Sequence, residues 1–408
     1  MKHKWDAIVI GGGQAGLAAR YELAKRGIDH VVLEREAIAA KWRERWDSFT
    51  LVTPNWTVKL PGAEYAGPEP DGFLPRDEIV AHLESYASLP GGEVVTGVEA
   101  TEVTASAGGG YRVDTNQGPY EAKALIVATG TFQKPKRPAA IGHPSSTVLE
   151  VHSSDYRNPD QLPAGGVLII GSAQTGMQLA DELLAAGRRV FISTGKAGRM
   201  PRRYRGADAF RWFERLGYFE QPVEALPSLA SRASGNPHNS GKGGGRTLNL
   251  HKMARDGAVI LGRLVALDGQ RADFAADRDA NVAFSDEYAT KLRSEIDKLI
   301  ADHGANSPEA DPADDYWGTD AFSQPDRSTV DLVAEGISSV IWSAGYSYDF
   351  SWIRPARLDV TGYPIQRSDY ADSDGLYFLG MHFLHWRKSG IFYGVGDEAE
   401  AIARQIAA

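Results

Sequence analysis

The feature that most constrains this chain is a glycine turn near its start. The apolar run AIVI is followed by Gly11, Gly13 and Gly16, then by a helical pattern and a second apolar run, HVVLE. A strand, a glycine turn, a helix and a second strand in this order are typical of a unit with parallel strands. The N-terminal segment therefore predicts an α/β domain whose helices cover the faces of a parallel sheet.

The spacing of the glycines also predicts what the turn binds. Gly11 permits the tight turn, Gly13 lets a pyrophosphate approach the backbone, and Gly16 lets helix and strand pack closely. The helix N-terminus then faces the anion. Glu34 ends the second strand, near the offset of about 20 residues at which an acid hydrogen-bonds a ribose hydroxyl. Because an acid there repels a 2′-phosphate, the expected ligand is FAD or NAD, and the alternative is a turn without a ligand.

A second copy of the turn lies in the segment VLIIGSAQTGMQLA. Gly171 and Gly176 keep their places, but Ala173 stands where the second glycine is expected. The added methyl group is expected to weaken or shift binding of a pyrophosphate without abolishing it. The question is whether this copy still binds a dinucleotide.

The residues after the second turn favour a working site. Thr194, with Ser193 before it, occupies the place that matches Glu34, and no acidic residue lies between Arg188 and Gly206. Five cations follow, namely Lys196, Arg199, Arg202, Arg203 and Arg205. Hydroxyls and positive charge at this strand end predict a site for the 2′-phosphate of NADPH. The alternative is an arginine run that only faces solvent.

Composition excludes several other classes of protein. The net charge of -9 gives no overall attraction to nucleic acid or to an anionic membrane. No apolar run reaches the roughly 18 residues of a membrane helix, so a soluble, cytoplasmic protein without a signal peptide is expected. Cysteine is absent, which excludes disulfides and a redox-active cysteine pair. The 10 histidines show no ligand spacing, so no metal is expected.

The order of these patterns predicts two Rossmann-like dinucleotide-binding domains, one for FAD and one for NADPH. Residues 1–140 are expected to begin the FAD-binding domain, with an antiparallel meander inserted between about Glu93 and Leu125. The proline-rich stretch from Thr131 to Pro144 marks a domain crossing. Residues 141–330 are expected to form the NADPH-binding domain, with an irregular insertion at about 206–305. Residues 331–408 return to the FAD-binding domain and end in a helix that begins near Ser389.

Two dinucleotide units in one chain resemble the two-dinucleotide-domain flavoproteins, and more narrowly the flavin-containing monooxygenases (class B) and the plant indole-3-pyruvate monooxygenases. The resemblance is carried by IVIGGGQAGL with Glu34, KWRERWDSFTLVTP, LIVATGTFQKPKRP, the second turn with its cations, and VIWSAGYSYDF with GLYFLG. The segments GRMPRRYRG, NPHNSG and GGRTLNLH are also similar to unassigned bacterial flavoproteins encoded near nitrilases. That looser likeness suggests a nitrogen-containing substrate.

The resemblance implies which residues contact the cofactors. Asn55 is similar to a flavin-facing asparagine and is the expected catalytic residue. The residues expected at FAD are Gly11, Gly13, Gln14, Ala15, Gly16, Glu34, Trp42, Arg43, Thr53, Val98, Thr129, Gly130 and Gly380. Those expected at NADPH are Gly171, Ala173, Gln174, Thr175, Gly176, Ser193, Thr194, Lys196 and Arg199. Of a linker fingerprint in the family, His152 and Tyr156 are in place, whereas Ser146 and Val148 replace the phenylalanine and the glycine.

The resemblance implies that NADPH reduces FAD and that a flavin C4a-peroxide then inserts one oxygen atom into a small organic substrate, by N- or S-oxygenation or a related reaction. The alternatives are a flavin-dependent NAD(P)H dehydrogenase of the quinone-reductase type and a flavin-binding redox sensor without turnover. A homodimer is compatible with the sequence. Segment 235–246 is expected to be either a lid or a disordered loop. His382, His385, Trp386 and Arg387 are expected either at the active site or in packing and surface positions.

Overall fold

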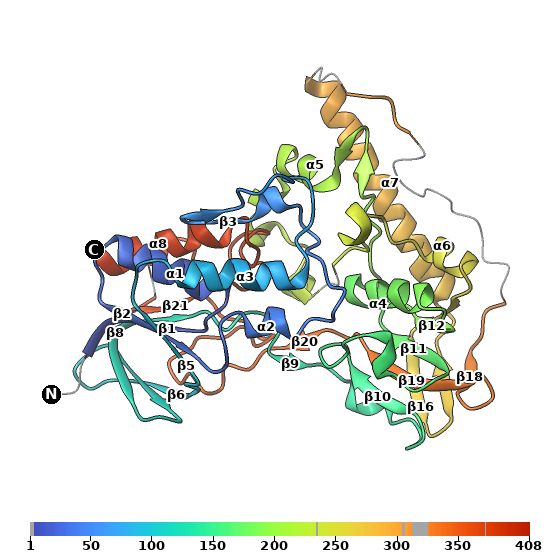
Figure 1. The fold of residues 1–408 in the computed structure, drawn as a ribbon, viewed down its shortest axis with the longest axis horizontal. Coiled ribbons are helices and arrows are strands. Elements are labelled where there is room, and N and C mark those ends of the chain that lie inside the picture. Colours follow the sequence, from blue (N-terminus) through green and yellow to red (C-terminus); the bar gives the residue numbers. More distant parts are fainter. Residues whose placement is uncertain (1–3, 234–235, 304–306, 312–324, 372) are drawn as a thin grey trace.

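The structure is a computed structural model that describes residues 4–233, 236–303, 307–311, 325–371 and 373–408. Two sheets, one mixed and one parallel, lie side by side, and each has a strand followed by a glycine turn and a helix (Figure 1). We refer to the two halves as the first unit and the second unit. No helix among these residues is long and apolar enough to cross a membrane.

The sheet of the first unit has the strand order β5-β2-β1-β8-β7-β6. Strands β1, β2, β5 and β8 are parallel, whereas β6, β7 and β8 pair antiparallel in sequence order. The C-terminal half of β8 pairs in parallel with β21. The bounds are β1 (Lys4–Ile10), β2 (His30–Glu34), β5 (Glu93–Thr96), β6 (Ala100–Ala105), β7 (Tyr111–Thr115), β8 (Tyr120–Val127) and β21 (Leu376–Phe378).

Alternating side chains of β1 and β8 fill two different cores, as the period of a strand requires. Ala7 and Val9 pack on one face together with α1 (Gln14–Lys25), α3 (Arg76–Ala87) and α8 (Val395–Ala407). Ile8 and Ile10 pack on the other face, with β6, β7 and the segment around Phe350. Figure 1 shows the three helices above this sheet and the antiparallel strands below it.

The sheet of the second unit has the order β10-β19-β11-β12-β15, and all of its strands are parallel. The bounds are β10 (Leu149–His152), β11 (Gly166–Ile170), β12 (Val190–Ser193), β15 (Val259–Leu261) and β19 (Ile337–Trp342). Helix α4 (Gln174–Ala185) follows β11, and a small antiparallel sheet is formed by β16 (Leu264–Asp268), β17 (Arg271–Phe274) and β18 (Thr329–Asp331).

The remaining elements connect or extend the two units. Strands β9 (Lys134–Pro135) and β20 (Tyr346–Ser347) pair antiparallel where the chain crosses between the units. Figure 1 shows the long helix α7 extending away from the body beside α5. The bounds are α2 (Ala40–Arg43), α5 (Ala209–Arg215), α6 (Leu250–Arg255), α7 (Arg278–His303), β3 (Lys59–Leu60), β4 (Ala63–Glu64), β13 (Arg203–Tyr204) and β14 (Ala207–Asp208).

Three of the sequence-based boundaries were wrong. Strand β19 lies between β10 and β11, so the return to the first unit comes after Trp342 and not at residue 331. Segment Glu93–Thr96 pairs in parallel with β2 and is an edge strand, not part of an antiparallel meander. Helix α8 begins at Val395, because residues before it, including Ser389, form a series of turns. The supposedly irregular stretch 206–305 also contains α7, which spans 26 residues.

The buried carboxylate of Glu182 in α4 accepts hydrogen bonds from both units or their linker, one from Ser48 and one from Tyr156. Ser48 of the first unit donates to one carboxylate oxygen at 2.6 Å, and Tyr156 donates to the other at 3.2 Å. Tyr156 is fully buried, and burial together with the nearby carboxylate raises the pKa of its hydroxyl. The tyrosine of the linker fingerprint therefore holds the carboxylate that joins the second unit to Ser48 of the first.

Replacing Tyr156 by Phe tests this structural role. The change leaves one oxygen of a buried carboxylate without its donor, which is expected to lower the free energy of unfolding by about 1.5–3 kcal/mol. Chemical denaturation of the FAD-loaded protein measures the loss. Tyr120→Phe is the matched control, because Tyr120 is only half-buried and its hydroxyl makes no hydrogen bond to the described residues. Equal stabilities of the two variants would contradict the role.

Candidate cofactor site

The first glycine turn has the backbone that its sequence predicts. Gly11 has a φ of +115°, and a Cβ on it would lie 2.5 Å from the carbonyl oxygen of Ala128. A Cβ on Gly16 would lie 1.8 Å from the carbonyl oxygen of Gly11. At Gly13, in contrast, φ is −88° and a Cβ would meet no atom within 4 Å. The turn is therefore packed tightly on its inner side and open at the position where a pyrophosphate would approach.

Glu34 is held at this turn by backbone donors. One carboxylate oxygen accepts from the N–H of Gly12 at 2.5 Å, and the other accepts from the N–H of Glu36 at 2.8 Å. Val98 is buried beside it, and its N–H donates to the carbonyl of Glu34. The acid thus has a fixed place at the end of β2, and its remaining lone pairs are available to a ribose hydroxyl.

The return segment after β21 closes onto the start of α1. The amide of Gln14 donates to the carbonyl of Gly390 at 2.9 Å and accepts from the indole N–H of Trp42 at 3.2 Å. Trp42 also stacks on Phe392 with ring centroids 5.5 Å apart. A Cβ on Gly380 would lie 2.3 Å from the Cβ of Ala15. Residues predicted from three distant segments therefore meet at one helix N-terminus.

Not every residue predicted at FAD faces this turn. Arg43 is exposed and forms an ion pair with Glu84 of α3, because its position on α2 directs it toward that helix. Thr129 and Gly130 follow β8, and the amide of Gln133 donates to both of them. Thr53 is half-buried just before Asn55.

Asn55 is committed to the backbone around it. Its amide donates to the carbonyl of Glu69 at 2.9 Å and accepts from the N–H of Leu74 at 2.7 Å, and the side chain is 3% exposed. In this conformation the amide braces segment 69–74. The role of Asn55 at the flavin stays a prediction.

The second turn has the same backbone geometry as the first, although Ala173 stands at the position of Gly13. Gly171 has a φ of +106°, and a Cβ on Gly176 would lie 1.9 Å from the carbonyl oxygen of Gly171. Ala173 has φ −75° and ψ −177°, close to the values of −88° and −171° at Gly13. Because φ is negative at this position, alanine adopts the conformation without strain. The substitution therefore leaves the turn intact.

The N-terminus of α4 is covered by part of the chain itself. The backbone N–H of Gln174, the first residue of the helix, donates to the carbonyl of Asn236 at 3.1 Å. The side chain of Gln174 donates to the carbonyl of Pro237, and that of Gln178 donates to the carbonyl of Asn239. We call residues 236–246 the capping segment. The carbonyl of Asn236 therefore accepts from the backbone N–H of Gln174, which a bound pyrophosphate would otherwise use.

The capping segment is packed against the rest of the protein and is not a disordered loop in the structure. His238 is fully buried, its N–H donates to the carbonyl of Gly198 at 2.7 Å, and burial lowers the pKa of its ring to about 4. A Cβ on Gly241 would lie 2.0 Å from the carbonyl oxygen of Leu51 in the first unit. The segment therefore contacts both units, while residue 235 lies outside the described residues.

The predicted hydroxyls of the 2′-phosphate site are engaged elsewhere. Ser193 donates to the carbonyl of Gly262 at 3.1 Å, and Thr194 donates to that of Leu261 at 2.7 Å. Both side chains are buried. A hydroxyl has a single proton to donate, so neither donates to a phosphate in this conformation. The partners lie at the end of β15 and directly after it, more than 60 residues away, and a role for Ser193 and Thr194 at a phosphate stays a prediction.

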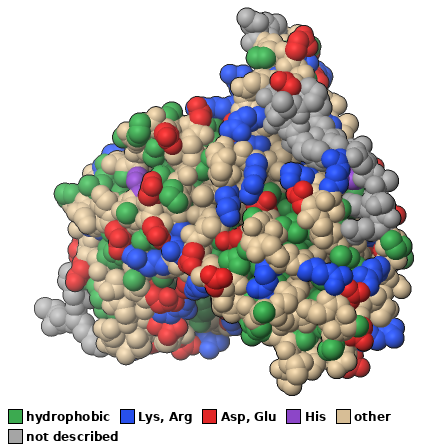
Figure 2. Space-filling view, turned by 45° about the vertical axis from the view of Figure 1, so that its right-hand side comes forward, with side chains coloured by type: hydrophobic (Ala, Val, Ile, Leu, Met, Phe, Trp, Pro, Cys, Tyr) green, Lys and Arg blue, Asp and Glu red, His purple; other side chains and the backbone are tan. Residues whose placement is uncertain are grey.

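The cations that follow β12 are also mostly paired. Arg199 is 1% exposed and pairs with Asp286 at 3.1 Å, and its expected role at a phosphate stays a prediction. Arg202 pairs with Asp208 and Arg205 with Asp297. Lysine and arginine side chains are interspersed with acidic ones over the face seen in Figure 2. Lys196, by contrast, is exposed and makes no ion pair within the described part of the chain.

The segment before α8 contains a buried polar cluster that sequence reasoning did not identify. His385 and Ser389 both hydrogen-bond to one carboxylate oxygen of Glu398, at 2.8 and 2.7 Å. Arg387 donates to Gln221, and His382 is held through its backbone N–H by Thr131. His385 is therefore a packing residue, and no group of His, Asp or Glu among the described residues is arranged to hold a metal ion.

The chain is similar in sequence to known oxidoreductases and monooxygenases. The family described as pyridine nucleotide-disulphide oxidoreductase matches residues 8–206. The chain is 31% identical over 415 residues to the CzcO-like oxidoreductase of Geobacillus kaustophilus (strain HTA426), over 100% of this chain and 99% of the relative. It is 32% identical over 187 residues to indole-3-pyruvate monooxygenase YUCCA1 of Oryza sativa subsp. japonica, over 45% of this chain and 46% of the relative.

Solved structures share the fold along its whole length. A flavin-containing monooxygenase from Stenotrophomonas maltophilia has a TM-score of 0.65 and 20% identity, covering 100% of this chain and 98% of that one. The bacillithiol disulfide reductase Bdr from Bacillus cereus also has a TM-score of 0.65, with 16% identity and 99% coverage of both chains.

The fold and its two glycine turns define a two-dinucleotide-domain flavoprotein oxidoreductase. Within that class, the chain belongs to the family of the CzcO-like oxidoreductases. It is an enzyme, and FAD and NADPH are its cofactors. The open position at Gly13 and the fixed acid Glu34 fit FAD. The second turn fits a dinucleotide once the carbonyl of Asn236 has moved away from α4.

Two alanine variants test the first turn. A methyl group on Gly13 meets no protein atom, so Gly13→Ala is expected to fold but to bind FAD at least about tenfold more weakly. Gly16→Ala forces the helix away from β1, so loss of the native fold is expected. Circular dichroism measures folding, and the absorbance ratio of FAD to protein measures occupancy. Full FAD occupancy in both variants would contradict the placement of the cofactor.

Proposed function

We propose that this chain is an NADPH-dependent FAD monooxygenase, which inserts one oxygen atom into a small organic substrate by N- or S-oxygenation or a related reaction. The overall balance is substrate, O₂, NADPH and a proton giving oxygenated substrate, NADP⁺ and water. The observation that carries the proposal is the pair of turns: the first keeps an acid at its strand end, and the second has none. That difference suits FAD at the first and NADPH at the second.

The absence of cysteine separates this proposal from the disulfide reductases that share the fold. A reductase of that kind passes electrons to a cysteine pair beside the flavin, and this chain contains no cysteine. The plant relatives in the comparison carry the name monooxygenase, which supports oxygen transfer as the reaction. Bound FAD supplies the hydride acceptor and the oxygen chemistry.

The protein's own residues would hold and shield the flavin. The backbone N–H groups at the start of α1 would bind the pyrophosphate, and Glu34 would bind the adenosine ribose. The contacts among Gln14, Trp42 and Gly390 would exclude water from the buried end of the site. The N-terminus of α8, beginning at Val395, would place its positive end toward negative charge that develops on the reduced ring.

The domain assignment follows from the same sheets. The first unit would be the FAD-binding domain, with its β6–β8 strands as an antiparallel addition to the parallel sheet. The second unit, from about β10 to β19, would be the NADPH-binding domain. Of the cations predicted at the 2′-phosphate, the exposed Lys196 would remain available in this conformation.

Oxygen transfer is tested with labelled oxygen. The purified FAD-loaded protein is mixed with NADPH, ¹⁸O₂ and a panel of small amines and sulfides. A product that carries one ¹⁸O atom, formed in proportion to the NADPH consumed, is the expected result. Oxidation of NADPH that depends on an added quinone and not on oxygen would instead show a dehydrogenase. No steady oxidation of NADPH under any of these conditions would show a redox sensor.

The capping segment gives a second test of where NADPH binds. Gln178 is buried in α4, and its amide holds the segment through the carbonyl of Asn239. Gln178→Met keeps the length of the side chain but removes this hydrogen bond. If the segment competes with NADPH at α4, the variant is expected to bind NADPH about threefold to tenfold more tightly, because the hydrogen bond is worth about 1 kcal/mol. Fluorescence titration of the reduced nicotinamide measures the affinity.

Arg354→Met is the control for this titration, since Arg354 forms an exposed ion pair with Glu102, away from the second turn. Its affinity for NADPH should equal that of the unmodified protein. Weaker binding in Gln178→Met would mean that the capping segment forms part of the NADPH site and does not compete with it.

A further inference from the structure

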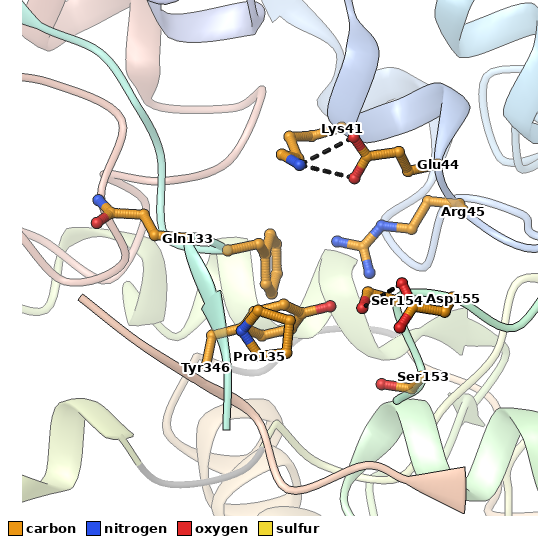
Figure 3. A pocket seen from close by; sticks show the side chains of 10 residues that line it. Lys41, Glu44, Arg45, Gln133, Pro135, Ser153, Ser154, Asp155 and Tyr346 are labelled. Atoms are coloured by element: carbon orange, nitrogen blue, oxygen red, sulfur yellow. Dashed lines mark hydrogen bonds and ion pairs between the residues drawn. The ribbon is translucent and has the colours of Figure 1, made fainter. Parts of the chain in front are cut away.

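A cavity of about 280 Å³ lies at the crossing between the two units. Figure 3 shows side chains from four segments pointing into it. Lys41, Glu44 and Arg45 come from α2 and the residues after it. Ser153, Ser154 and Asp155 follow β10, and the crossing segments contribute Phe132, Gln133, Pro135 and Tyr346. An occupant would therefore touch both units and both crossing segments at once.

The cavity is separate from the two glycine turns. Trp42 of α2 turns toward Gln14 and Phe392 in the first turn, whereas its neighbour Lys41 lines the cavity. No residue of either glycine turn lies among the residues that line it. A ligand of this cavity would accordingly bind in addition to the cofactors.

Arg45 is a lining cation that forms no ion pair within the described part of the chain. The guanidinium of Arg45 forms no ion pair and no side-chain hydrogen bond with the described residues. It lies over the ring of Phe132, 4.4 Å from the centroid, and the side chain is half-buried. Burial lowers the pKa of Arg45, which reflects the cost of holding this charge away from water. A desolvated guanidinium that faces a cavity is suited to a planar oxyanion, which it binds through two parallel hydrogen bonds.

The other residues that line the cavity indicate which kind of anion would bind there. Lys41 is neutralised by Glu44 at 2.7 Å, and Asp155 adds a negative charge at the rim. Among these four charged groups, Arg45 is the cation that forms no ion pair with a described residue, and a second negative charge on a ligand would be repelled by Glu44 and Asp155. Phe132 and Tyr346 form an edge-to-face pair with centroids 5.0 Å apart, which offers an apolar wall. Ser153 is buried, and its side chain also lines the cavity.

We propose that this cavity binds a small monocarboxylate with a flat apolar body. The carboxylate pairs with Arg45, and the apolar body packs against Phe132 and Tyr346. Because the occupant contacts α2 on one side and the residues after β10 on the other, it stabilises the arrangement of the two units seen in the structure. The proposal does not depend on which reaction the flavin carries out.

Binding is tested by calorimetry on the FAD-loaded protein without NADPH, with benzoate as the probe. Benzamide has the same shape without the charge, and inorganic phosphate has charge without the apolar body. Saturable binding of benzoate, with at least about tenfold weaker binding of benzamide and of phosphate, is the expected result. No saturable binding of benzoate, or equal binding of benzamide, would overturn the proposal.

Variants locate the probe. Arg45→Met is expected to weaken benzoate binding at least about tenfold, and Arg45→Lys less, because lysine keeps the charge but loses the planar fork. Arg354→Met is the matched control and should leave the affinity unchanged. FAD content and melting temperature confirm that each variant is folded. Unchanged affinity in Arg45→Met would place the probe elsewhere and overturn the proposal.

A competition experiment separates this cavity from the cofactor site. NADPH at saturation should leave the affinity for benzoate within about twofold, because the proposed site excludes the glycine turns. Loss of benzoate binding in the presence of NADPH, with Arg45→Met weakening both ligands, would show that the cavity belongs to the path of the dinucleotide. That result would overturn the additional site and leave the proposed function intact.

Discussion

Each unit depends on one backbone contact, the approach of a helix to the strand that precedes it. At Gly16 and Gly176 a Cβ would lie within 2 Å of the carbonyl oxygen of Gly11 and Gly171, so only glycine permits the approach. The contact fixes where α1 and α4 begin, and therefore where their N–H groups point. The returning segment with Gly380 can close onto α1 because the start of that helix is fixed. The parallel sheet supplies the scaffold, but these two contacts set the positions of the functional groups.

The two turns have the same backbone and different surroundings. At the first, the space beside Gly13 is open and Glu34 is held by the turn. At the second, Ala173 has almost the same dihedral angles, yet the first N–H of α4 is already bonded to the carbonyl of Asn236. The methyl group is therefore a smaller obstacle to a dinucleotide than the capping segment is. The alanine in the motif leaves open whether the second turn binds a dinucleotide. In the structure the answer depends on the capping segment, which begins more than 60 residues further along the chain.

The sequence predicted the features that depend on local geometry. It did not predict the contacts that side chains make with residues far away in the chain. The glycine turns, α1 and the end of β2 follow from spacing and from the period of the apolar residues, and the structure has them in place. The hydroxyl of Thr194 bonds to the last residue of β15, that of Ser193 bonds to the residue after it, and Arg199 pairs with Asp286 of α7. No local pattern reveals such partners. Strand β19 was assigned to the wrong sheet for a related reason, since an apolar run does not indicate which parallel sheet it joins.

The contacts between the units suggest how occupancy of one site affects the other. The capping segment packs on Leu51 through Gly241, and Arg202 donates to the carbonyl of Val52, so residues next to the second turn lie against the chain just before Asn55. A dinucleotide that displaces Asn236 from α4 must therefore disturb contacts to the first unit as well. The crossing strands β9 and β20, and the cavity beside them, form a different part of the same junction. Displacement of the capping segment would loosen the contacts at Leu51, whereas an anion at Arg45 would hold the crossing strands, so the two ligands would act on separate contacts between the units.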